Sequence, residues 1–131
     1  MKTLGIDYGK HKVGIAFSDS PLSEPLKVII YEEIDVLKEK IKRLVEEMAI
    51  ERVVVGVSEG EMGEESKDFA KDLEDYLNIQ VATFDETLST QYAQSLSIQA
   101  GMGQKKRHQM EDAFAAAVML QNYLDDEVNK V

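Results

Sequence analysis

The sequence predicts an α/β domain in which helices flank a mixed β-sheet, and three observations lead to this prediction. The N-terminal quarter holds three short, apolar, β-prone runs with tight connections, which is typical of an antiparallel meander. The middle of the chain alternates segments of helical period with β-branched runs, as crossover connections between parallel strands do. No repeat, low-complexity tract or interdomain linker interrupts the 131 residues, so a single domain is expected over 1–131.

The predicted elements follow one another closely. Strands are expected at Thr3–Ile6, Val13–Phe17, Leu26–Tyr31, Arg52–Val57 and Ile79–Phe84. The fourth is an uninterrupted β-branched run, which favours a strand covered on both faces. Apolar residues at helical spacing predict helices over 34–48, 69–77, 90–98 and 112–124, and a loop is expected at Gly60–Gly63. The order β-β-β-α-β-α-β-α-α fits an α/β domain with a mixed sheet.

The composition excludes several kinds of site. There are no cysteines, which rules out disulfides, thiolate zinc sites, iron–sulfur clusters and a cysteine nucleophile. His11 and His108 are the only histidines, so a zinc site built from imidazoles is not expected. No stretch approaches the roughly 18 apolar residues of a membrane span, and charge comes too early for a signal peptide. These features predict a soluble cytoplasmic protein with no membrane partner.

The charge balance is strongly acidic, with 15 basic and 25 acidic residues, a net charge of −10 and a pI near 4.6. A passive nucleic-acid coat normally shows a positive footprint, so this balance argues against one. It remains compatible with an enzyme that meets phosphates through metal ions held by carboxylates.

Three acidic residues stand where ligand sites gather in α/β proteins. Asp7 ends the first predicted strand, Glu86 follows the last one, and Asp112 opens the final helix. Carboxylates that converge repel one another unless a divalent cation compensates their charge, and oxygen ligands favour Mg²⁺ or Mn²⁺ over zinc. Such a site suits phosphodiester hydrolysis and needs neither a covalent nucleophile nor a histidine base.

Each of these acids also has a purely structural interpretation. Asp7 precedes Tyr8 and Gly9 and is a residue type that forms turns. Glu86 and Asp112 both stand near predicted helix starts, where the helix dipole favours acidic side chains. Spacing alone leaves both interpretations open.

A short basic string contrasts with the acidic background. Lys105, Lys106 and Arg107, followed by His108, lie beside the candidate metal site and are expected to guide a phosphate backbone. Lys10 and Lys12 in the first turn extend this patch. The alternative is an exposed loop and an ordinary hairpin tip, with no role in nucleic-acid binding.

Four motifs, in order and at compatible spacing, resemble the YqgF family, also called RuvX. They are Gly5–Gly9 with Val13–Asp19, Val53–Gly56, Asp85–Thr90 in the place of a D-E-R-L-S-T signature, and Lys105–Arg107 followed by Asp112, Ala115 and Ala116. The family comprises proteins first described as Holliday-junction resolvases and now more often as pre-16S rRNA nucleases. The resemblance covers nearly the whole chain.

The resemblance implies a single RNase H-like nuclease domain with a five-stranded mixed sheet flanked by helices. It implies that Asp7, Glu86 and Asp112 form the catalytic and metal-binding triad for Mg²⁺ or Mn²⁺. Asp85 is an alternative to Glu86, because adjacent residues of an extended segment point in opposite directions. The implied substrate is structured rRNA, at the 5′ end of pre-16S rRNA, or branched DNA. A resolvase would act as a homodimer, whereas an rRNA nuclease need not.

Two departures from the family pattern concern substrate binding. Thr87 stands where the family usually has Arg, and Val57–Gly60 stands where it typically has a Leu-Pro. These changes make a non-catalytic nucleic-acid-binding module of the same fold an alternative. Gly5–Gly9 also resembles the phosphate loop of the sugar-kinase, Hsp70 and actin superfamily. Those proteins need two such domains, and one is expected here.

Overall fold

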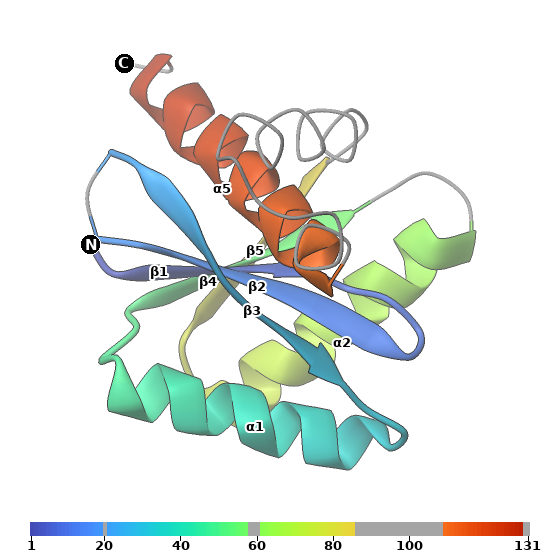
Figure 1. The fold of residues 1–131 in the computed structure, drawn as a ribbon. Coiled ribbons are helices and arrows are strands. Elements are labelled where there is room, and N and C mark those ends of the chain that lie inside the picture. The colour runs from blue at the N-terminus through green and yellow to red at the C-terminus, as the bar shows by residue number, and fades with distance from the viewer. Residues whose placement is uncertain (20, 58–60, 86–108, 130–131) are drawn as a thin grey trace.

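A computed structural model describes residues 1–19, 21–57, 61–85 and 109–129 (Figure 1). Its five strands form one sheet in the order β3-β2-β1-β4-β5. The bounds are β1 Thr3–Asp7, β2 Lys12–Ser18, β3 Ser23–Ile30, β4 Arg52–Val57 and β5 Gln80–Asp85. Strands β1 to β3 form an antiparallel meander, while β4 runs parallel to β1 and β5 parallel to β4. The predicted mixed α/β sheet and its meander are confirmed.

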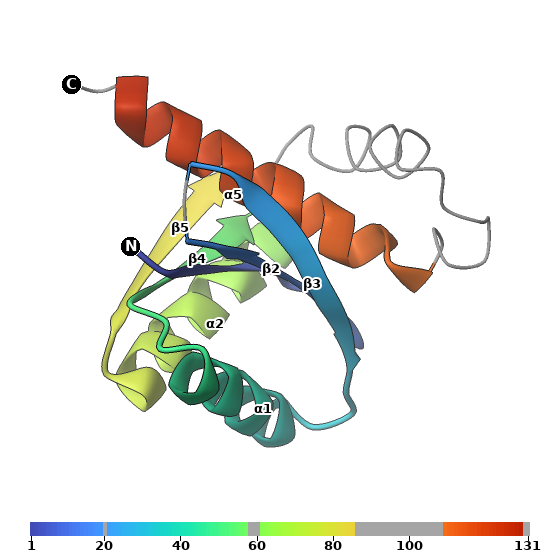
Figure 2. The same ribbon diagram turned by 60° about the vertical axis from the view of Figure 1, so that its left-hand side comes forward.

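Helices cover both faces of this sheet. Helices α1 (Ile34–Glu47) and α2 (Glu61–Leu77) lie on one face, and α5 (Glu111–Asn129) crosses the other (Figures 1 and 2). None of the described helices combines the length and the apolar character needed to span a membrane.

Some predicted boundaries are wrong. Helix α2 begins at Glu61, so the loop expected at Gly60–Gly63 is wrong from residue 61 onward. Gly63 lies within this helix, where a glycine lowers stability by about 1 kcal/mol relative to alanine. Burial of the helix face that carries Phe69 and Leu73 offsets this loss. Strand β3 begins three residues earlier than predicted and contains Pro25, which an edge strand tolerates. The helix predicted over 90–98 lies outside the described residues.

Alternation along the strands sorts side chains between the two faces. Leu4 and Ile6 of β1 belong to the larger core, under α1 and α2, together with Val53 and Val55 of β4. The residue between the two valines, Val54, instead packs with α5. Asp7 follows Ile6 and ends β1, so alternation places its side chain on the α5 face.

Helix α5 approaches the sheet closely because small residues face each other. A Cβ atom on Gly5 would lie 3.0 Å from the Cβ of Leu120, and one on Gly14 would overlap the backbone of α5. The residues of the buried part of the helix are alanine-rich and run from Ala113 to Leu120. This close packing fixes the height of α5 above the strands.

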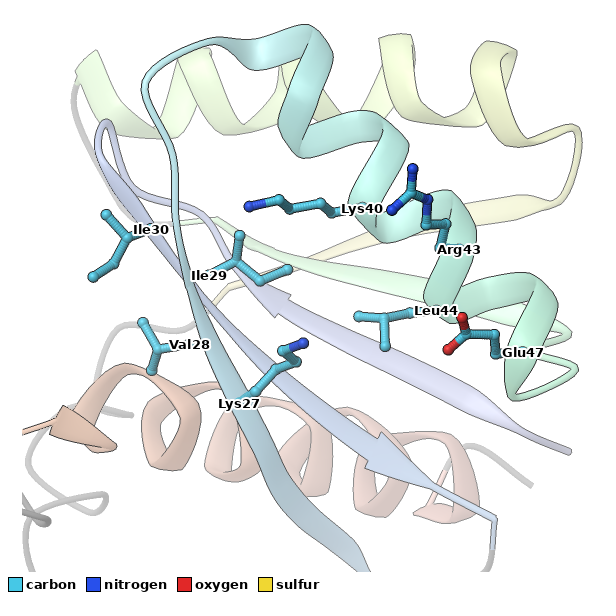
Figure 3. A pocket seen from close by; sticks show the side chains of 8 residues that line it. All are labelled: Lys27, Val28, Ile29, Ile30, Lys40, Arg43, Leu44 and Glu47. Carbon is cyan, nitrogen blue, oxygen red and sulfur yellow. The ribbon is translucent and has the colours of Figure 1, made fainter.

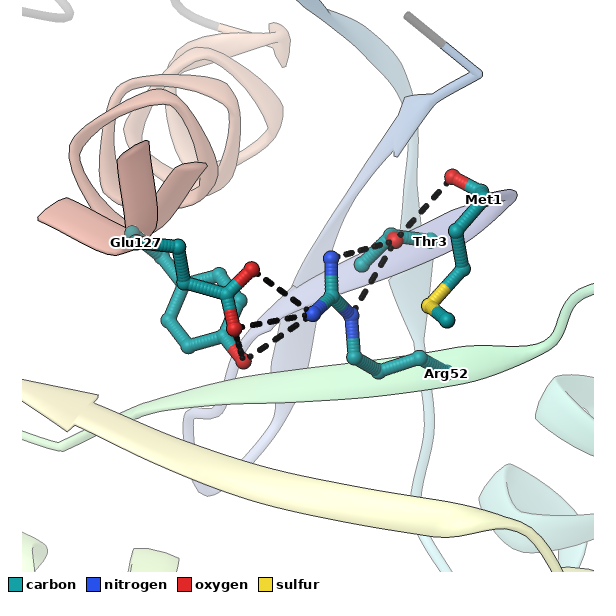
Figure 4. A network of polar contacts seen from close by, with 5 residues as sticks. Met1, Thr3, Arg52 and Glu127 are labelled. Carbon is teal, nitrogen blue, oxygen red and sulfur yellow. Dashed lines mark hydrogen bonds and ion pairs between the residues drawn. The ribbon is translucent and has the colours of Figure 1, made fainter. Parts of the chain in front are cut away.

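Arg52 anchors the C-terminal half of α5 to the start of the sheet (Figure 4). Its side chain is buried, and its guanidinium donates hydrogen bonds to Thr3 Oγ1 at 3.3 Å, Tyr123 Oη at 3.3 Å and both Glu127 carboxylate oxygens at 2.9 and 3.0 Å. Burial raises the pKa of Tyr123, and its hydrogen bond to Glu127 raises it further. The buried cation is therefore paired with a carboxylate and with two hydroxyl oxygens, as a buried charge requires.

Candidate active site

Asp7 lies at the carboxyl end of β1, in the middle of the sheet. Its register partners are Gly14 on β2 and Gly56 on β4. Neither neighbour carries a side chain that would compete with Asp7 for space on this face. In α/β sheets this edge is where ligands bind.

Asp112 reaches the same edge through the close contact between α5 and β2. A Cβ on Gly14 would lie 1.9 Å from the backbone oxygen of Asp112, so the first turn of α5 rests directly on this glycine. Gly14 is also the register partner of Asp7. Two acids separated by more than a hundred residues thus meet at one end of the sheet and on one face.

A pocket of about 270 Å³ lies between these acids. Asp7 and Asp112 line it together with the turn formed by residues 8–12. Lys12 Nζ lies 3.2 Å from Asp112 Oδ2, with the Lys12 side chain 54% exposed and that of Asp112 31% exposed. The structure therefore places two of the predicted basic residues, Lys10 and Lys12, beside the acids.

Aromatic residues hold the turn that follows Asp7. The Tyr31 hydroxyl donates to the Gly9 carbonyl, and the Tyr31 backbone N–H donates to the His11 carbonyl at 2.9 Å. The ring of Tyr8 stacks on Phe69 of α2, with centroids 4.4 Å apart. Burial raises the pKa of Tyr31, and hydrogen bonding with Tyr8 adds to the shift. These contacts connect the turn to the core on the opposite face from α5.

Sequence reasoning missed Gly14 and Tyr31. Gly14 interrupts an apolar strand, which is a signal for close approach of another backbone. Nothing in the sequence indicates that the hydroxyl of Tyr31, just after β3, would reach back to Gly9. That contact depends on the tertiary pairing of β2 with β3.

The register of β5 indicates the face of the sheet on which Asp85 lies. Phe84 lies opposite Gly56, and its ring meets that of Tyr123 on α5 edge-on at 5.7 Å. Asp85 lies opposite Val57 and follows Phe84, so alternation places its side chain on the α1 and α2 face. Asp85 is therefore on the opposite face from Asp7. Glu86, Thr87, Lys105, Lys106 and Arg107 lie outside the described residues.

The donor atoms of this pocket suit a hard divalent cation. Asp7 and Asp112 offer carboxylate oxygens, and the pocket contains no thiolate. Oxygen ligands of this kind fit Mg²⁺ or Mn²⁺. Among the residues that the structure describes, no three His, Asp or Glu side chains form a metal-binding group. The third predicted ligand, Glu86, is one of the residues not described.

Comparison with known proteins gives consistent results. The chain is 33% identical over 138 aligned positions to a Natranaerobius thermophilus protein named "Putative pre-16S rRNA nuclease", covering 99% of this chain and 98% of that one. A Bacillus cytotoxicus protein of the same name is 36% identical, with 97% and 100% covered. Both relatives align over essentially their full lengths.

Solved structures share the fold at low sequence identity. T. thermophilus RuvC in complex with a Holliday junction substrate matches with a TM-score of 0.65 at 13% identity, covering 98% of this chain and 96% of that chain. Fowlpox virus resolvase in complex with Holliday junction DNA matches with a TM-score of 0.66 at 13% identity, covering 98% and 99%. The expected RNase H-like fold is confirmed by these resolvases.

A family-level match covers almost the whole sequence. The family model described as "RuvX: Holliday junction resolvase" matches residues 1–126. The matched range contains both acids of the pocket and the turn between β1 and β2. The chain therefore belongs to the RuvX family.

Proposed function

We propose that this protein is a single-domain, metal-dependent endonuclease that hydrolyses phosphodiester bonds in structured nucleic acid. One observation carries the proposal: Asp7 and Asp112, from distant parts of the chain, line the same pocket at the carboxyl end of β1. The descriptions of the family and of its relatives as a resolvase and as nucleases indicate the same enzyme class, a phosphodiester hydrolase.

Asp7, Asp112 and Glu86 are proposed to hold the cation. Support for Glu86 comes from Asp85, which lies on the opposite face of the sheet and is thereby disfavoured as the third ligand. A bound Mg²⁺ or Mn²⁺ would supply an acidified water and positive charge for the attacked phosphate. The two carboxylates would orient this charge, while the stacked Tyr8 keeps the turn after Asp7 in place.

The cations around the pocket are proposed to hold the substrate. Lys10 and Lys12 line the pocket and would attract a phosphate backbone toward the acids. Lys105, Lys106 and Arg107 precede α5 in the sequence and are proposed to extend this surface. In a chain of net charge −10, such a local basic patch is needed to offset repulsion of phosphates.

The substrate we propose is pre-16S rRNA, because relatives that are 33% and 36% identical to this chain are named "Putative pre-16S rRNA nuclease". Within that RNA we propose the 5′ end, which the family resemblance implies. A four-way DNA junction is the second candidate, since the family description names it. A junction substrate would call for a homodimer, because two strands must be cut symmetrically. Oligomeric state measured alongside cleavage therefore helps to separate the two.

The test is to incubate the purified protein with a pre-16S rRNA fragment and with a four-way junction, each with EDTA, Mg²⁺ or Mn²⁺. Metal-dependent cleavage of the RNA is expected, and Asp7→Asn should abolish it. Asp85→Asn is the matched control, because it removes an acid from the other face. Cleavage that persists in Asp7→Asn would contradict the proposal. Binding without cleavage under any metal would identify a non-catalytic module instead.

A further inference from the structure

A second pocket, of about 400 Å³, lies between β3 and α1 (Figure 3). Residues 27–30 of β3 form one wall, and Lys40, Arg43, Leu44 and Glu47 of α1 form the other. Strand β3 is an edge of the sheet, so this groove opens at the side of the molecule. Among the described residues, the groove and the acidic pocket have no lining residue in common.

The lining of the groove has the opposite charge to the protein as a whole. Of the described residues that line it, Lys27, Lys40 and Arg43 are cationic and Glu47 alone is anionic, in a chain of net charge −10. Arg43 Nη2 lies 3.0 Å from Glu39 Oε1, which partly neutralises it. Lys27 extends from β3 and Lys40 from α1 into the space between them (Figure 3). Neither lysine forms an ion pair with another residue in the described part of the chain.

The groove and the acidic pocket lie on opposite faces of the sheet, on either side of the β2–β3 pair. Lys12, which contacts Asp112, lies opposite Ile30, and Ile15 lies opposite Lys27. Three residues along a strand span about 10 Å, so the two lysines are close along the strands, although Lys12 lies on the α5 face and Lys27 on the α1 face. Because β3 is an edge strand, a phosphate backbone that leaves the acidic pocket past Lys12 would pass around this edge to reach the groove.

We infer that the groove between β3 and α1 binds the phosphate backbone of the nucleic acid at a distance from the cleaved bond. This inference rests on the proposed function, because it names a further contact to the same substrate. Lys27 and Lys40 hold the phosphates, while Ile29 and Leu44 form the apolar floor between them. Sequence-independent contacts of this kind raise affinity and fix the position of the substrate.

An acidic peptide added to the β3 edge is the competing occupant, and the strand opposes it. Pro25 removes a backbone donor from this edge, and the β2–β3 register shifts between Ile15 and Ala16. A lysine such as Lys27 on an edge strand also discourages strand addition. Phosphates need only the two ammonium groups and no regular backbone ladder.

The test compares two double variants that remove the same charge. Lys27→Ala/Lys40→Ala empties the groove, and Lys67→Ala/Lys71→Ala removes two exposed lysines from α2. Binding of a labelled RNA hairpin is measured by fluorescence anisotropy in EDTA across a salt series. Loss of two phosphate contacts should lower the slope of log affinity against log salt by about 1.4–1.8 in the groove variant. The α2 variant should keep the parent's slope.

Cleavage assays separate this inference from the proposed function. With an active parent, the groove variant should show a raised KM and an unchanged kcat, since the acids are untouched. If both double variants bind with the parent's slope while the parent cleaves, the groove inference alone is wrong. It is also wrong if the groove variant loses only binding of poly-glutamate, which would indicate a protein partner. A parent that neither binds nor cleaves RNA would contradict both proposals.

Discussion

Two of the ion pairs in the described part of the chain connect α5 to the sheet, one near each end of the helix, and they differ in exposure and in the number of partners. Arg52 and Glu127 lie 2.9 Å apart with the arginine side chain 10% exposed, and Thr3 and Tyr123 complete the shell of Arg52. Lys12 and Asp112 lie 3.2 Å apart with more than half of the lysine side chain exposed. In the first pair the cation is buried and shared among several acceptors, whereas in the second the cation is open to solvent.

The difference indicates that the C-terminal end of α5 stabilises the fold, whereas the N-terminal end is open for ligand binding. Arg52 is buried, so removal of its carboxylate partner would leave an uncompensated charge in the core. An exposed pair such as Lys12–Asp112 contributes only about 0–1 kcal/mol, so another cation can replace Lys12 at small cost. We expect Lys12 to neutralise Asp112 until metal and substrate bind.

The largest effect is expected from Gly14→Ala, which separates α5 from β2 at the acidic end. The added Cβ would lie 1.9 Å from the Asp112 oxygen, so the first turn of the helix must move. A displacement of about 1 Å at a reacting centre can lower the rate about a hundredfold, and overpacking costs about 1–3 kcal/mol. Cleavage rate and urea denaturation measure the two effects.

Gly5→Ala is the control, because its Cβ would meet Leu120 farther along the helix. It should lower the free energy of unfolding but leave kcat much closer to that of the parent. Full activity in Gly14→Ala would contradict the close contact as the determinant of the site.

Arg52→Ala tests the buried end of the helix. It leaves Glu127 and Tyr123 without their shared donor. Breaking a fully buried pair costs about 3–5 kcal/mol, and since Glu127 is 43% exposed we expect about 2 kcal/mol here. The kcat of the folded fraction should stay at the parent's value. A loss of kcat without a loss of stability would show that the buried end of α5 contributes to the chemistry at its exposed end.

Tyr31→Phe tests the hydroxyl that holds the turn after Asp7. Loss of its hydrogen bond to Gly9 should lower the free energy of unfolding by about 0.5–1.5 kcal/mol at neutral pH. The folded protein raises the pKa of Tyr31, so the neutral phenol favours folding below about pH 10, and this contribution is lost as pH rises further. The variant should therefore lose stability less steeply than the parent above about pH 10.

Tyr123 gives the same sign at the other end of the molecule, because its pKa is also raised. Some alkaline destabilisation should therefore persist in Tyr31→Phe and decrease further when Tyr123→Phe is added. Identical pH profiles for Tyr31→Phe and the parent would exclude Tyr31 as a contributor. Chemical denaturation at several pH values measures this.

The smallest effect on stability is expected from Lys12→Ala. The exposed ion pair contributes at most about 1 kcal/mol, so the melting temperature should change little. Affinity for Mn²⁺ should rise slightly, because a positive charge beside Asp112 is removed. A large loss of stability would mean that Lys12 is a structural residue like Arg52.

The sequence predicted most of this fold because local and global signals agree. The valine run of β4 indicated a strand buried on both faces, and Val53, Val54 and Val55 are all fully buried. The start of α2 was missed because Gly63 favours a loop locally, while packing of the helix decides otherwise. Pro25 similarly argued against a strand over the first part of β3. A proline is tolerated there because β3 is an edge strand.

The candidate site was predictable in part. Asp7 and Asp112 were identified by their positions at strand and helix ends, and the structure brings them together. The support beneath them could not be predicted, because Gly14 and Tyr31 act through contacts between strands far apart in the sequence. The choice between Asp85 and Glu86 depends on the register of β5, which the sequence alone does not specify.

The most direct test of the central claim is a Mn²⁺ titration followed by electron paramagnetic resonance. The claim is that acids on the α5 face of the sheet hold the cation, and three proteins decide it: the parent, Asp112→Asn and Asp85→Asn. Asp112→Asn should weaken Mn²⁺ binding by at least about tenfold, as loss of a metal-site group does. Asp85→Asn, on the opposite face, should bind like the parent. Equal affinity in the parent and Asp112→Asn, or a greater loss in Asp85→Asn, would contradict the account.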